Sequence, residues 1–97
     1  MSDSDELVNQ QGATSIYIDV EVKGNGDLLF SGQDIGEAPE EYFGKSDHEY
    51  WLTVPAYEKE NLLLALIEKH YAGDACVMSK LQELMESKKI THYFDSY

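Results

Sequence analysis

The chain has 97 residues, which suits one domain and is too short for two. It carries 19 acidic side chains and seven lysines with no arginine, a formal charge of −12. Binding to nucleic-acid phosphates or to an anionic membrane surface is therefore not expected, because both need a cationic footprint. The hydrophobic fraction of 42% supports a folded protein rather than a disordered one.

The N-terminal segment is polar and acidic, and we predict a flexible acidic arm over residues 1–14. This segment has neither the basic start nor the apolar stretch of a signal peptide. The chain contains a single cysteine, Cys76, so it cannot form an intramolecular disulfide. Its longest apolar run, residues 62–67, is too short to span a membrane. Together these features predict a cytoplasmic protein with no membrane association.

A β-hairpin is the clearest local signal. Apolar and polar residues alternate over 16–22, which predicts a strand, and the glycines of the segment 24–26 predict a tight turn. A three-residue loop with Gly26 in the left-handed conformation pairs Val22 with Leu28 and keeps the apolar residues on one face. A two-residue turn would shift the register by one and move them to the other face, so we predict the longer loop.

Glycines interrupt the pattern after this hairpin, and we predict a long acidic connection over 31–48. A third strand is expected over 49–54, followed by a helix over 55–72 that ends at Gly73. Asp74 is the expected N-cap of a second helix.

A last strand is expected over 90–96, where apolar and polar residues alternate again. The predicted order is β-β-β-α-α-β. We therefore predict one α+β domain over 15–97, with two layers: a four-stranded antiparallel sheet and two helices packed on one of its faces. The apolar stripes of the helices should then be buried, namely Leu63, Leu66, Ile67, Leu81 and Leu84.

No set of residues predicts catalysis or metal binding. The three histidines and Cys76 are too far apart in the sequence for the usual spacing of zinc ligands. Cys76 has no base beside it in the sequence, and no phosphate-binding loop or two-cysteine redox motif is present. We therefore expect neither an enzyme nor a protein with a metal or other cofactor.

The negative charge is concentrated in the first half of the chain. Residues 1–50 have a net charge of −10, and residues 51–97 have a net charge of −2. The predicted open face of the sheet mixes carboxylates with aromatic side chains, which provide steering and anchoring for a cationic protein. The predicted protein-binding residues of this face and of the long connection are Tyr17, Asp19, Glu21, Asp34, Glu37, Glu40, Glu41, Tyr42, Asp47, Trp51 and Tyr93.

In size, charge and lack of a catalytic set, the chain is similar to small acidic immunity and antitoxin proteins. This similarity implies an inhibitor that neutralises a basic, nuclease-type bacterial toxin by competing with phosphates for its cationic cleft. One alternative is a phage-type inhibitor or DNA mimic that acts on a nucleic-acid-binding host complex. Another is a homo-oligomeric structural or interaction protein, such as a homodimer, whose aromatic sheet face is self-complementary.

Overall fold

The computed structural model describes residues 4–36 and 47–96. The chain has an α+β fold with a four-stranded antiparallel sheet and two α-helices, as predicted, but in the order β-β-β-β-α-α. It divides into two compact units, Met1–Leu62 and Leu63–Tyr97, where one domain over 15–97 was expected. We call them the sheet unit and the helical unit and describe each by itself.

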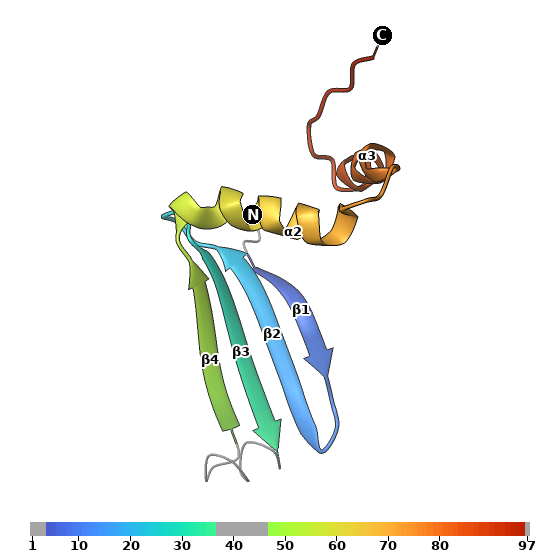
Figure 1. Cartoon of the computed structure of the whole chain (residues 1–97). Coiled ribbons are helices and arrows are strands. Elements are labelled where there is room, and N and C mark those ends of the chain that lie inside the picture. Colours follow the sequence, from blue (N-terminus) through green and yellow to red (C-terminus); the bar gives the residue numbers. More distant parts are fainter. Residues whose placement is uncertain (1–3, 37–46, 97) are drawn as a thin grey trace. The chain divides into compact units, whose positions relative to one another are not determined.

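The sheet is an antiparallel meander in which each strand pairs with its neighbour in the sequence (Figure 1). The strands are β1 (Ser4–Gln10), β2 (Thr14–Val22), β3 (Leu28–Gly36) and β4 (Asp47–Val54).

The turn between β2 and β3 has the predicted geometry. Val22 pairs with Leu28, and the Lys23 N–H donates to the Asp27 carbonyl oxygen at 2.8 Å. Gly26 has a φ of 93°, a conformation that glycine adopts without a steric cost. The predicted three-residue loop and its register are confirmed, and this register puts most of the apolar residues of both strands on one face, whereas Leu29 and Ile35 lie on the other.

The predicted flexible arm over 1–14 is wrong for Ser4–Gln10, which form the edge strand β1. Val8 is the single apolar residue of β1 that lies opposite an apolar residue of β2, namely Ile18. The pairing register between β1 and β2 shifts between Glu6 and Val8. This bulge interrupts the alternation on which a strand prediction depends. Backbone pairing with β2 therefore defines β1 more than its side chains do.

The predicted strand over 90–96 is also wrong, since these residues have no regular secondary structure. Their alternation is compatible with a strand, but a strand needs a neighbour with which to exchange backbone hydrogen bonds. No described strand pairs with this segment. The fourth strand of the sheet comes from the N-terminus instead.

The predicted connection over 31–48 begins too early and ends too late, because residues 31–36 continue β3 and β4 begins at Asp47. Gly32 lies inside β3, where the ring of Tyr50 on β4 occupies the place that a Cβ atom would take. A glycine inside a strand often marks such a close approach rather than a turn.

The helical segments begin with the short 3₁₀ helix η1 (Ala56–Glu58), followed by α2 (Lys59–Tyr71) and α3 (Val77–Ser87). Asp27 of the β2–β3 turn accepts a hydrogen bond from the Ala56 N–H at 2.8 Å, which connects η1 to the sheet within the sheet unit. The predicted stop after α2 is confirmed, because Gly73 has a φ of 83°.

A Schellman motif ends α3. Lys89 is left-handed, with a φ of 58°, and its N–H donates to the Glu86 carbonyl oxygen at 3.2 Å. The Ile90 N–H donates to the Met85 carbonyl oxygen at 2.8 Å. These two bonds satisfy carbonyl groups that a helix end leaves without partners, and they direct Ile90 back toward Met85.

Three leucines of the helix stripes that were predicted to be buried are exposed in the structure. Leu63, Leu66 and Leu84 are 56%, 45% and 48% exposed. Ile67 and Leu81 are half-buried, and no hydrophobic side chain in the described part of the chain is fully buried. The packing of the helices on the sheet stays a prediction.

Candidate protein-binding surface

The pairing register gives the two faces of the sheet different chemistry, because directly opposite residues of antiparallel strands share a face. One face is mostly apolar. Its apolar and aromatic members are Val8, Ile16, Ile18, Val20, Val22, Leu28, Phe30, Tyr50, Leu52 and Val54.

The other face carries most of the carboxylates, and we call it the acidic face. Its acidic and aromatic members are Glu6, Tyr17, Asp19, Glu21, Asp47, Glu49 and Trp51. None of the four strands contains a lysine to balance these acids. Glu6 even lies directly opposite Asp19, a like-charge pair that destabilises an isolated sheet.

A hollow of about 150 Å³ lies on this face between two aromatic residues, Tyr17 and Trp51. Two adjacent cross-strand rows build it. In one row Asp19 is opposite Ser31, which is opposite Trp51; in the other Tyr17 is opposite Gln33, which is opposite Glu49. Each row therefore has an acid at one end and an aromatic ring at the other. The acid is on β2 in the first row and on β4 in the second.

The small side chain of Ser31 in the middle of its row leaves room for this hollow. Trp51 is 63% exposed, so its indole remains accessible to a ligand. Strands two apart in a sheet are separated by about 10 Å, so one extended side chain from a partner fits between Asp19 and Trp51. We call this site the acidic-face hollow.

The structure brings together the predicted residues Tyr17, Asp19, Glu21 and Trp51 on the acidic face, with Asp47 at the start of β4 on the same face. Glu6, Ser31, Gln33 and Glu49 also belong to this face and were not predicted as site residues. The period-two pattern of 49–54 already puts Glu49 on the face of Trp51, whereas Glu6 became visible only with strand β1.

Other predicted residues lie elsewhere. Asp34 belongs to β3 rather than to a loop, and it points to the opposite face, where it pairs with Tyr50. Tyr93 belongs to none of the four strands; it lies in the irregular C-terminal segment and is 93% exposed. The remaining predicted residues lie outside the described part of the chain: Glu37, Glu40, Glu41 and Tyr42.

Asp34 and Tyr50 form a polar pair within the apolar face. The Tyr50 hydroxyl donates to Asp34 Oδ1 at 2.7 Å, and the rings of Tyr50 and His48 are 5.4 Å apart between centroids. This hydrogen bond, followed by burial and by the negative charge of Asp34, raises the pKa of Tyr50 above its ordinary value of 10.0. Tyr50 therefore acts as a protonated donor that joins β3 to β4.

No group of three or more His, Cys, Asp or Glu side chains within 4–36 and 47–96 is arranged to hold a metal ion. Over the same ranges, no helix is both long and apolar enough to cross a membrane. The chain matches no known protein-family model, and no curated protein or solved structure compared with it is significantly similar.

Proposed function

We propose that this protein is an acidic binding module that docks a basic partner protein on its acidic face. The observation that carries the proposal is the acidic-face hollow, in which two aromatic rings and two carboxylates surround a small polar floor. A lysine or arginine side chain matches this chemistry, because a cation is attracted both to aromatic faces and to carboxylates.

The charges of the surrounding face favour the same class of partner. The acidic face has five carboxylates and no lysine, and its negative potential speeds the approach of a cationic surface at low salt. The repulsion between Glu6 and Asp19 is relieved when a cation lies between them. Carboxylates therefore supply steering, while the exposed Trp51 supplies the anchor.

More specifically, we propose that binding to the acidic face inhibits the basic partner. A surface of this charge competes with nucleic-acid phosphates for a cleft lined by lysine and arginine, as an immunity protein or antitoxin does against a nuclease-type toxin. The compartment that we propose is the cytoplasm, and the supporting observation is the single cysteine, Cys76, whose exposed thiol is compatible with a reducing environment.

The anchor is tested by replacing Trp51 with Ala. The partner is first captured from the native host with the full chain and identified, and an arginine nonapeptide serves as a defined cationic probe. Trp51→Ala should weaken binding by roughly 30-fold or more, mainly through faster dissociation. Tyr57→Ala, which removes an aromatic ring that is exposed on η1, is the matched control and should bind like the wild type.

The carboxylates are tested with two double variants of equal charge. Asp19→Asn with Glu49→Gln should slow association and flatten its dependence on salt. Glu60→Gln with Asp95→Asn changes the net charge by the same amount without altering any residue of the acidic face and should have a smaller effect. Equal behaviour of the two double variants would show that net charge alone acts, and the acidic-face hollow would lose its role.

A further inference from the structure

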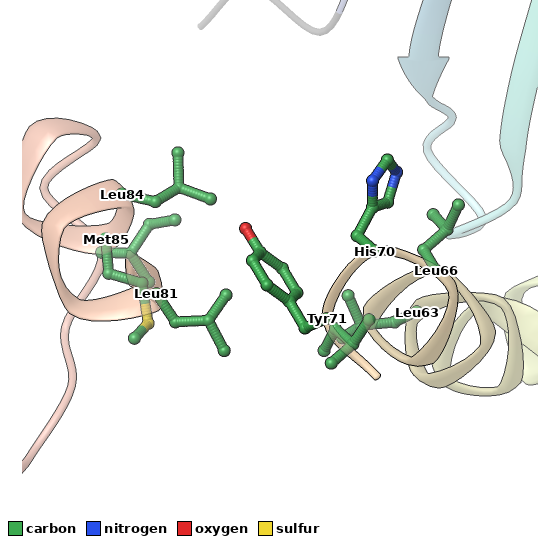
Figure 2. Close-up of a pocket in the computed structure, with 9 residues that line it drawn as sticks. Leu63, Leu66, His70, Tyr71, Leu81, Leu84 and Met85 are labelled. Carbon is green, nitrogen blue, oxygen red and sulfur yellow. The ribbon is translucent and has the colours of Figure 1, made fainter. Parts of the chain in front are cut away.

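The helical unit contains an apolar groove that the proposed function does not use. It has a volume of about 550 Å³ and runs between α2 and α3. Its principal lining residues are Leu63, Leu66, Tyr71, Leu81, Leu84 and Ile90. Figure 2 shows the Tyr71 ring between the two helices, with Leu81 and Leu84 across from it. We call this feature the helical groove.

The helical groove is open and lined almost entirely by carbon. The leucines at positions 63, 66 and 84 are about half exposed, and the polar groups of the lining are the His70 imidazole and the Tyr71 hydroxyl. An exposed apolar surface with so few polar groups resembles the interfaces of obligate homodimers, which are more apolar than those of transient complexes.

Charge distinguishes this unit from the rest of the chain. The helical unit has five acidic residues and four lysines, whereas Met1–Leu62 has fourteen acidic residues and three lysines. Two copies of the protein repel each other through their acidic sheet units. The helical unit has a net charge of only −1, so a contact between two copies through this unit meets less charge repulsion than a contact through the sheet units.

The shape of the unit also suits a second copy. α3 has 11 residues and is about 16 Å long, and the part of α2 that belongs to this unit, residues 63–71, is about 14 Å long. Their groove-lining residues recur at spacings of three and four, so they form ridges that fit between those of another helix pair. Two such pairs bury their stripes in the manner of a four-helix bundle.

We propose that the helical groove binds the helical unit of a second copy of this chain and forms a symmetric four-helix interface. A basic partner is attracted to the acidic face and not to a groove of nearly balanced charge. The groove instead fits a surface that is apolar and flanked by charges of both signs, which is the chemistry of the helical unit itself. This proposal does not depend on the proposed function.

The test is the mass of the full chain in solution, by light scattering after size exclusion. The expected wild-type result is twice the chain mass of 11.0 kDa. Leu66→Gln and Leu84→Gln should each raise the dimer dissociation constant by at least about 100-fold, because a symmetric interface contains each substitution twice. Leu64→Gln is the matched control, since Leu64 is an exposed leucine of α2 outside the groove lining, and it should remain dimeric.

Salt separates this proposal from the proposed function. Added salt should weaken binding to a basic partner, whereas it should leave the dimer unchanged or strengthen it by screening the sheet units. If a groove variant does not fold, the wild-type unfolding temperature should still rise with protein concentration. A monomer whose unfolding temperature is independent of concentration would overturn the proposal, as would a dimer that Trp51→Ala disrupts and the groove variants do not.

Discussion

Tyr50 shows how much one side chain contributes to the sheet. Its ring fills the space above Gly32 on the neighbouring strand, and its hydroxyl donates to Asp34 two residues further along that strand. An aromatic ring opposite a strand glycine compensates for the packing that glycine lacks. The same residue therefore explains why β3 tolerates a glycine and why Asp34 is kept away from the acidic face.

Replacing Tyr50 with Phe should destabilise the sheet unit by about 1–3 kcal/mol, because the half-buried Asp34 carboxylate loses its hydrogen-bond donor. The raised pKa of Tyr50 means that its contribution is present below pH 10.0 and is lost as pH rises through the folded-state pKa. The Tyr50→Phe variant should not show this loss of stability at alkaline pH. Urea unfolding at neutral and alkaline pH measures both effects, and a variant as stable as the wild type at neutral pH would contradict the role assigned to the pair.

At the scale of whole elements, the link between α2 and α3 depends on the carboxylate of Asp74. Asp74 accepts a hydrogen bond from the Cys76 N–H at 2.9 Å and pairs with Lys80 Nζ at 2.6 Å. The Lys80 ammonium first, and then the Cys76 amide, lower the pKa of Asp74 below its ordinary value of 3.8. Asp74 thus orders the first turn of α3 although Cys76 is the N-cap residue.

Asp74→Asn should remove an acid-sensitive contribution to the order of this turn. A carboxylate with a lowered pKa stabilises the folded state above its unfolded-state pKa, and the contribution disappears as pH falls through the folded-state value. The wild type should therefore lose α3 helicity below about pH 4 more steeply than the variant does. Circular dichroism during acid titration measures this difference. Asp95→Asn, in the irregular C-terminal segment, serves as the control and should titrate like the wild type.

The sequence correctly predicted those elements in which apolar side chains recur at regular spacing and whose ends have local turn or capping residues. The β2–β3 hairpin is the clearest case, because both its glycine turn and its apolar face determine the same register. β1 was missed because a bulge interrupts its pattern. The segment 90–96 has a strand pattern, but no short-range signal reports whether a pairing partner exists.

The candidate site was predictable to the same extent. Tyr17, Asp19 and Trp51 could be assigned to one face from alternation alone, since each belongs to a strand that the pattern identified. The hollow between them depends on which strands are neighbours and on the small Ser31 lying between Asp19 and Trp51. Asp34 was assigned to a loop, because Gly32 and Gly36 were interpreted as turn residues, whereas both lie within β3.

Across the whole molecule, the two units differ most in charge. Because most of the acidic excess belongs to the sheet unit, mutual repulsion lowers the stability of that unit more than it lowers the stability of the helical unit. The single tryptophan, Trp51, lies in β4, so its fluorescence reports on the sheet unit. The helical circular dichroism signal reports mainly on α2 and α3.

Raising the salt concentration from about 10 mM to about 150 mM shortens the screening length from about 30 Å to about 8 Å. The unfolding temperature detected by Trp51 fluorescence should rise over this range, and the midpoint of the helical signal should move less. A Trp51 midpoint that falls with added salt would show that favourable ion pairs, rather than repulsion, dominate the sheet unit.

The meander order of the sheet has a consequence for how the protein folds. Every strand pairs with a strand that is adjacent in the sequence, so each step closes a hairpin and no strand waits for a distant partner. Chains with such local pairings have a low contact order and cross their folding barrier quickly for a β-rich protein. We expect the tight β2–β3 turn to form first, because its loop is short and Gly26 fixes its register. We expect β1 and β4 to add to its two sides, and during synthesis all four strands leave the ribosome before α3 does.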